Sequence, residues 1–92
     1  MRMLDDNLKS MSSWVAAESL QTRSRDRLNG IAVELEVRNC ARGLTLFRAY
    51  LDRLQEISTN EDVSATLSIF RESVREISAE EYAIVRPQVP TI

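Results

Sequence analysis

The sequence predicts an all-α protein: an antiparallel helical hairpin with an additional N-terminal helical segment that completes a bundle within an oligomer. Apolar residues recur at alternating steps of four and three over residues 31–57 and 61–85, which places them on one side of a helix. The chain has only two glycines and two prolines, too few for the many turns of a multi-stranded fold. A chain of 92 residues makes one domain.

Within this domain we distinguish an N-terminal segment (1–29), the hairpin (30–86) and an extended tail (87–92). The N-terminal segment repeats the four–three step at Leu4, Leu8, Met11 and Val15, which indicates a helix near residues 5–20. Residues 21–27 are wholly polar, and Asn29-Gly30 is a turn signal. This stretch is therefore either an exposed helical continuation or a break.

The hairpin is predicted from two seams that face each other. The first helix, residues 31–57, carries its seam at Val33, Val37, Cys40, Leu44, Phe47, Leu51 and Leu54. The second helix, residues 61–85, carries its seam at Val63, Leu67, Phe70, Val74, Ile77 and Ile84, with Glu81 interrupting it. Because about three residues join two long helices, these must run antiparallel.

The ends of the second helix also have sequence signals. Ser58 with Glu61, or Thr59 with Asp62, provides a capping signature for its start. Pro87 disfavours helical geometry in the residue before it, so the helix should end near Val85 or Arg86.

A second apolar stripe on the first helix points to an interface. It lies roughly 130° from the seam at ~100° per residue, and its members are Ile31, Leu35, Leu46, Tyr50 and Ile57. A helix that is apolar on two faces needs two partners. The stripe could meet the folded-back N-terminal segment, a second copy of the chain, or a foreign hydrophobic surface. We expect self-association, and therefore at least a dimer.

The residues that would support catalysis are missing from the sequence. The chain has no histidine, the commonest general base and metal ligand, and no phosphate-binding loop, zinc spacing or Ser-His-Asp set. We therefore expect neither an enzyme nor a bound cofactor or metal. Cys40, the single cysteine, lies on the seam and is expected to be a small core residue.

Charge and hydropathy restrict the partners further. A net charge of −2 argues against nucleic acid, because a protein that neutralises many phosphates needs a basic excess. No apolar run approaches the ~20 residues of a transmembrane helix. The acidic start lacks the apolar stretch of a signal peptide. These features predict a cytoplasmic protein without a transmembrane segment.

One family shows the same order of features. An amphipathic helix carries Arg38-Asn39, then Tyr50-Leu51-Asp52-Arg53-Leu54-Gln55-Glu56-Ile57, a short polar turn, and a second helix with Leu67-Ser68-Ile69-Phe70-Arg71-Glu72-Ser73-Val74-Arg75-Glu76. From about Gly30 to Val85 the chain resembles the phasins, bacterial proteins that coat polyhydroxyalkanoate storage granules. It lacks the alanine-rich extension of many phasins. The resemblance implies a non-enzymatic coat protein whose helices rest on a hydrophobic polyester and self-associate. The alternative is a small helical adaptor or subunit that docks onto a larger protein.

Overall fold

The computed structural model describes residues 14–15, 18, 24–74 and 76–89. Its elements are α2 (Arg25–Val37), α3 (Ala41–Ile57), α4 (Glu61–Ser73), α5 (Ala79–Val85) and the 3-10 helix η1 (Arg86–Gln88). These residues include helices and turns but no strand. The predicted all-α fold class is therefore confirmed for the part of the chain that the structure describes.

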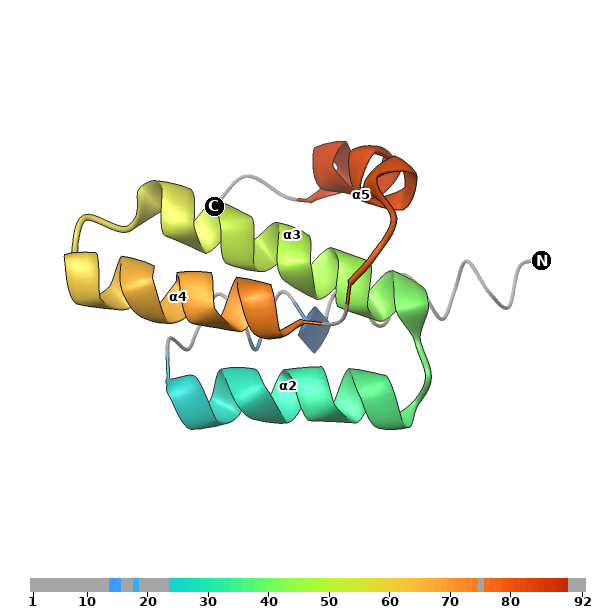
Figure 1. Cartoon of the computed structure of the whole chain (residues 1–92), viewed down its shortest axis with the longest axis horizontal. Helices are drawn as coiled ribbons and strands as arrows, with labels where there is room; N and C mark the ends of the chain where they lie inside the picture. The colour runs from blue at the N-terminus through green and yellow to red at the C-terminus, as the bar shows by residue number, and fades with distance from the viewer. Residues whose placement is uncertain (1–13, 16–17, 19–23, 75, 90–92) are drawn as a thin grey trace.

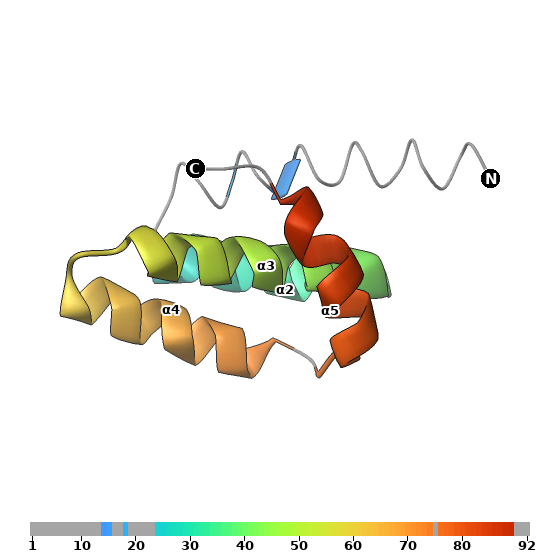
Figure 2. The same ribbon diagram turned by 90° about the horizontal axis from the view of Figure 1, so that it is seen from above.

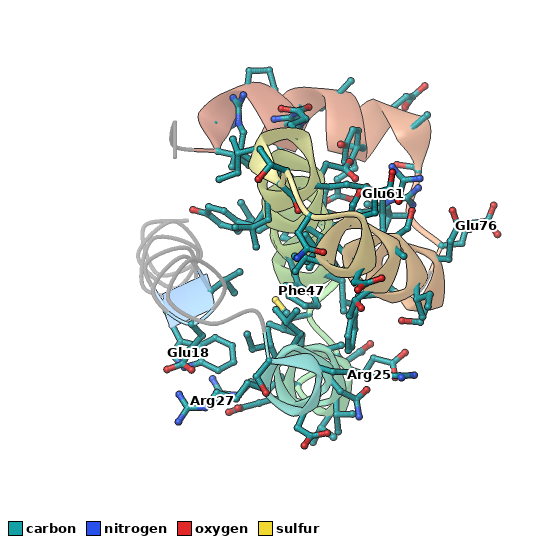
Figure 3. All side chains as sticks on the ribbon, turned by 90° about the vertical axis from the view of Figure 1, so that its left-hand side faces the viewer. Glu18, Arg25, Arg27, Phe47, Glu61 and Glu76 are labelled. Atoms are coloured by element: carbon teal, nitrogen blue, oxygen red, sulfur yellow. The ribbon has the colours of Figure 1, made fainter. Side chains whose placement is uncertain are left out.

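The central element is α3, which has the other helices around it. It contacts α2, α4 and α5, and Figure 1 shows α2 and α5 on opposite sides of it. α4 runs antiparallel beside α3 (Figures 1 and 2). The end-on view in Figure 3 shows the same order, with α3 between α5 and α2 and α4 alongside.

The prediction of one continuous helix over residues 31–57 is wrong, because α2 ends at Val37. Asn39 adopts the left-handed conformation, with φ of 51°. The Cys40 amide donates to the Leu35 carbonyl at 3.1 Å, and the Asn39 amide donates to the Glu36 carbonyl at 2.9 Å. These two bonds define a Schellman motif, which satisfies the last carbonyls of a helix and reverses the chain. Asparagine is one of the few residues that tolerate this backbone geometry.

The turn considered at Asn29-Gly30 does not exist, because both residues lie inside α2. The alternative, an exposed helical continuation, describes the chain from Arg25 onward. A Cβ added at Gly30 would meet nothing within 4 Å, so packing does not require glycine there. The turn signal fails because the buried residues on either side, Leu28 and Ile31, hold this part of α2 against the core.

The connection between α3 and α4 has the predicted bounds but a different cap. α3 ends at Ile57 and α4 begins at Glu61. Neither Ser58 nor Thr59 is the capping residue. The capping residue is Asn60, whose side-chain oxygen accepts hydrogen bonds from the amides of Asp62 at 2.8 Å and Val63 at 3.4 Å. An asparagine in this position satisfies amides that the helix leaves without partners.

The second predicted helix, residues 61–85, is also two helices. α4 ends at Ser73, and Val74 is extended. α5 begins after Ser78, whose hydroxyl oxygen accepts from the Glu81 amide at 3.1 Å. Ser78 and Glu81 have the spacing of a capping box. The glutamate that interrupts the apolar seam is thus part of a helix start.

The C-terminal residues differ from the predicted extended tail. α5 ends at Val85, as Pro87 predicts, but Pro87 and Gln88 continue into η1. Val89 is 4% exposed and belongs to the core. Residues 90–92 lie outside the described residues.

The core combines α3 with one face of each neighbouring helix. Residues of the predicted seams that are buried there are Leu44, Phe47, Leu51, Leu54, Leu67, Phe70 and Val74. Cys40, Val63 and Ile77 are half-buried. Val33, Val37 and Ile84 are exposed, so their assignment to the seam was wrong. The four–three spacing places residues on one side of a helix only while that helix continues. The helix breaks after α2 and α4 therefore change which residues face the core.

The predicted interface stripe is mostly inside the molecule. Ile31, Leu35, Leu46 and Tyr50 are at most 4% exposed within a single chain, and only Ile57 keeps a large exposed fraction, 42%. Val15, in the N-terminal segment, is fully buried in the same core. The argument that this stripe needs a second copy therefore fails, because the chain covers it. The remainder of the predicted helix at residues 5–20 lies mostly outside the described residues.

Candidate functional site

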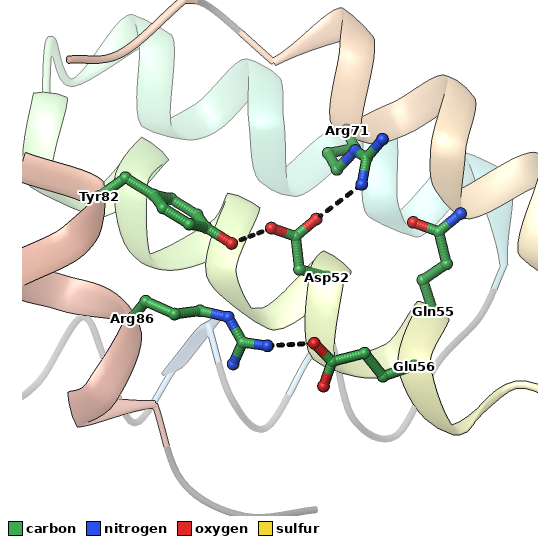
Figure 4. Close-up of a pocket in the computed structure, with 6 residues that line it drawn as sticks. All are labelled: Asp52, Gln55, Glu56, Arg71, Tyr82 and Arg86. Atoms are coloured by element: carbon green, nitrogen blue, oxygen red, sulfur yellow. Dashed lines mark hydrogen bonds and ion pairs between the residues drawn. The ribbon is translucent and has the colours of Figure 1, made fainter. Parts of the chain in front are cut away.

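A polar cluster fills the space between α3, α4 and α5 (Figure 4). It consists of Asp52, Gln55, Glu56, Arg71, Tyr82 and Arg86. α3 supplies Asp52 and, one turn later, Gln55 and Glu56, which places them on the side of α3 that faces α4 and α5. Two carboxylates therefore meet two guanidinium groups and one phenol.

The charged groups of this cluster are paired with one another. The Asp52 carboxylate accepts from the Tyr82 hydroxyl and from Nη1 of Arg71, the latter at 3.4 Å. Arg86 donates to Glu56. Gln55 extends the polar contacts towards α4, donating to the Ser68 hydroxyl at 3.0 Å. The cluster thus connects α5 and α4 to the central helix.

The Tyr82 phenol stays protonated in this setting. Burial raises its pKa above the usual 10.0, and the hydrogen bond to the Asp52 carboxylate raises the pKa further. The Arg48 guanidinium lies 5.7 Å from the centre of the Tyr82 ring, within the range of a cation–π contact. The phenol therefore remains a hydrogen-bond donor over a wide pH range, which suits a structural clamp between α5 and α3.

A metal site is not formed by the described residues. Among them, no group of three or more His, Cys, Asp or Glu side chains is placed to hold an ion. The carboxylates of the polar cluster are occupied by Arg71, Tyr82 and Arg86. We interpret the cluster as a set of structural contacts that position α5 on α3.

Exposed apolar side chains lie on a different surface, along α2 and on the neighbouring α4. Val33 is 52% exposed and Val37 is 80% exposed, although both are large apolar residues on one side of α2. Ile69 of α4, which is 55% exposed, lies across a small cleft from Asn29, one turn before Val33. We call Val33, Val37 and Ile69, with Asn29 between them, the α2–α4 face.

A second cleft lies at the end of α2 where the chain turns into α3. It measures about 360 Å³ and is lined by Glu36, Asn39, Cys40, Ala41, Leu44, Glu76, Ile77, Ser78 and Glu81. We call it the acidic cleft, because three of its lining residues are carboxylates and none is basic. Glu36 lies in the last turn of α2, so the acidic cleft is at the C-terminal end of this helix.

The sequence-predicted interface and the surface observed here share no apolar residue. Ile31, Leu35, Leu46 and Tyr50 are in the core, whereas Val33 and Val37, expected in the core, are outside. The sequence signal that could have placed Val33 and Val37 on the surface is Asn39, because asparagine often follows the last residue of a helix. Cys40 is a half-buried residue at the start of α3 and lines the acidic cleft.

Comparisons with known proteins add no family to this description. No protein-family model, no curated protein and no solved structure matches the chain. In the described residues, no helix combines the length and the hydropathy that crossing a membrane requires.

Proposed function

We propose that this chain is a non-enzymatic binding protein, a small helical adaptor that docks onto a larger protein through the α2–α4 face. The supporting observation is the exposure of Val33 and Val37, 52% and 80%, on a helix whose opposite side already lies in the core. Full burial of one such side chain is worth ~1.5–3 kcal/mol. A partner that covers both valines and Ile69 would gain from removing three apolar side chains from water.

The two sides of α2 provide a controlled test by site-specific photo-crosslinking. A benzophenone amino acid is introduced at Val37 in one variant and at Arg27 in the other. Both positions are exposed, and Figure 3 shows Arg27 pointing away from α4. In the cells that naturally produce the protein, the Val37 variant should give one adduct of discrete mass. The Arg27 variant should give none.

The result also separates the adaptor from an oligomer. A foreign protein in the Val37 adduct, identified by mass spectrometry, supports docking. An adduct with twice the mass of the chain would contradict the adaptor function. It would support the homo-oligomer expected from the sequence, formed through the α2–α4 face. Equal labelling patterns from Val37 and Arg27 would contradict a binding role for the α2–α4 face.

Coating of a polyester granule, which the phasin resemblance implies, is the second candidate function. Large exposed apolar side chains occur on every described α-helix: Val33, Val37, Ile57, Ile69 and Ile84. α3 has all of its large apolar side chains except Ile57 in the core, so a coat would require the bundle to open. Co-sedimentation with purified polyhydroxyalkanoate granules tests this function. Binding that is lost in a Val33→Glu/Val37→Glu double variant would favour the coat.

A further inference from the structure

We propose that two copies of this chain pair through α2 at high protein concentration, with the two helices antiparallel. The pairing covers Val33 and Val37, two residues of the α2–α4 face, so it competes with the partner of the adaptor. This competition rests on the proposed function, whereas the pairing itself rests on the residues of α2 alone.

The side of α2 that faces away from the core carries a four–three pattern of its own. Four exposed residues follow these steps and, at ~100° per residue, lie on one side of the helix: Asp26, Gly30, Val33 and Val37. The buried residues of α2 lie on the opposite side. A seam with this spacing is the surface through which two helices pair as a coiled coil. The surface therefore suits another helix, and α2 of a second copy carries the same pattern.

Gly30 leaves a hollow in this seam. A Cβ added at Gly30 would meet no heavy atom within 4 Å, so the chain itself leaves the space above this residue open. In an antiparallel pair whose two-fold axis passes midway between residues 31 and 32, Gly30 lies opposite Val33 of the second copy. The missing side chain makes room for that valine and allows the two backbones to approach closely.

The same register brings opposite charges together along one edge of the pair. Arg27 and Glu34 are seven residues apart and flank the seam on the same edge of α2. Antiparallel pairing places Arg27 of each copy beside Glu34 of the other, so the two-fold axis generates two identical ion pairs. A parallel pair would leave these charges about 10 Å apart along the helix axis. The charge pattern therefore favours the antiparallel arrangement.

Both charged side chains are accessible to a second copy. Arg27 is exposed, points away from α4 (Figure 3), and takes part in none of the ion pairs of the described residues. The Glu34 side chain is 44% exposed, and its Oε1 lies 2.8 Å from Nη2 of Arg38. Because a carboxylate has two oxygens, Glu34 can bind Arg38 and Arg27 of the second copy at once.

The pairing surface is small, which makes the pairing weak. α2 has 13 residues and spans about 20 Å at ~1.5 Å per residue, whereas a stable interface buries ~800 Å² per partner. The loss of rigid-body freedom on association offsets much of what the covered valines contribute. We therefore expect dimers near millimolar chain concentration, and free chains with an open α2–α4 face at low micromolar concentration.

Reversal of the charges tests the register. Arg27→Glu and Glu34→Arg are made separately in the full chain, and self-association is measured by sedimentation equilibrium from about 10 µM to about 1 mM. The wild type should dimerise within this range. Each variant alone should associate about tenfold more weakly, because it places like charges at both symmetric positions. An equimolar mixture of the two variants should dimerise as the wild type does, because both ion pairs form again with reversed charges.

Two control variants carry the same charge changes away from this edge. Arg25→Glu changes a residue on the side of α2 towards α4, and Glu72→Arg changes a residue of α4. Both residues are exposed, and each variant should self-associate within about twofold of the wild type. Circular dichroism compares the helicity of all four variants. Recovery on mixing also excludes misfolding as the cause of weak association, because mixing does not refold a damaged chain.

Each result decides between distinct conclusions. A wild type that stays monomeric at about 1 mM would overturn the pairing, and so would a dimer that neither charge reversal weakens. A mixture that stays monomeric would overturn the antiparallel register. If the mixture stays monomeric but Val37 crosslinks to a foreign protein in cells, the adaptor function stands and this inference falls. If the mixture dimerises but Val37 and Arg27 crosslink alike in cells, the pairing stands and the proposed function fails.

Discussion

At the scale of single residues, Asp52 accepts hydrogen bonds from two helices at once. Its two carboxylate oxygens take the Tyr82 hydroxyl of α5 and the Arg71 guanidinium of α4. The side chain of Asp52 is only 16% exposed, so these contacts replace much of its hydration. A change at Asp52 would remove a polar contact to each of the two helices, whereas a change at Tyr82 removes only the contact to α5.

Tyr82→Phe should lower the free energy of unfolding by about 1 kcal/mol near neutral pH, because it removes one hydrogen bond to a charged acceptor at a half-buried site. The pKa of Tyr82 is raised above 10.0 in the folded chain. The stability that the neutral phenol contributes is therefore fully present below the unfolded-state pKa of about 10, and it is lost as the pH rises through the folded-state pKa.

Urea denaturation between pH 7 and 11 measures this effect. The difference between wild type and Tyr82→Phe should stay constant up to about pH 9 and shrink above pH 10. A stability difference that stays unchanged at pH 11 would show that the hydrogen bond donated by the phenol does not stabilise the folded chain.

Leu46→Glu should unfold the domain, because Leu46 is 4% exposed and an unpaired buried charge costs ~3–5 kcal/mol. That is a large part of the ~5–15 kcal/mol that stabilises a typical domain. Val37→Glu is the control, since Val37 is 80% exposed, and it should change stability by less than ~0.5 kcal/mol. Thermal melts followed by far-UV circular dichroism compare them.

The Leu46→Glu variant also tests the interface that the sequence suggested. A stable, fully helical variant with half the molecular mass of the wild type would mean that Leu46 lies between two chains. Loss of helical signal would agree with its position in the core of one chain.

At the scale of elements, the turn between α2 and α3 depends on one backbone conformation. Asn39 has a φ of 51°, which costs most residues ~1–2 kcal/mol but costs glycine nothing. Asn39→Ala should therefore destabilise the chain by about 1 kcal/mol, and Asn39→Gly should be neutral or stabilising. Chemical denaturation of the three proteins gives the order. If alanine is tolerated as well as glycine, the left-handed turn is not formed in solution.

Helix ends were the least predictable elements, and the reason is physical. Ile57 and Glu61 were predicted as bounds because three consecutive polar residues separate them. Asn39 and Ser78 each end or start a helix through a single local motif. The apolar four–three spacing continues across Asn39, and near Ser78 it is interrupted only at Glu81. Apolar periodicity reports which residues prefer burial, but it does not report whether the backbone between them reverses direction.

At the scale of the whole molecule, the sequence predicts the helical class and much of the core but not the binding surface. Leu51, Leu54 and Leu67 were expected in the core and lie there. Val37 is expected in the core and Tyr50 at an interface between copies, whereas Val37 is exposed and Tyr50 lies in the core of the single chain. The turn at Asn39 contributes to this difference, because it folds α2 back on α3 instead of extending it. Surface predictions therefore depend on topology more strongly than core predictions do.

The attachment of α5 has a consequence for the motions of the folded chain. α5 is held to α3 by two polar contacts, Tyr82–Asp52 and Arg86–Glu56, between residues thirty positions apart in the sequence. Val85 is the one buried residue of α5, whereas α3 is held by many buried apolar side chains. Ion pairs weaken in salt, while apolar contacts do not. Amide hydrogen exchange in residues 79–85 should therefore become faster between 0.05 and 1 M sodium chloride, while exchange in residues 44–54 stays constant. The C-terminal helix would then detach as a separate opening unit, with a lifetime set by ionic strength.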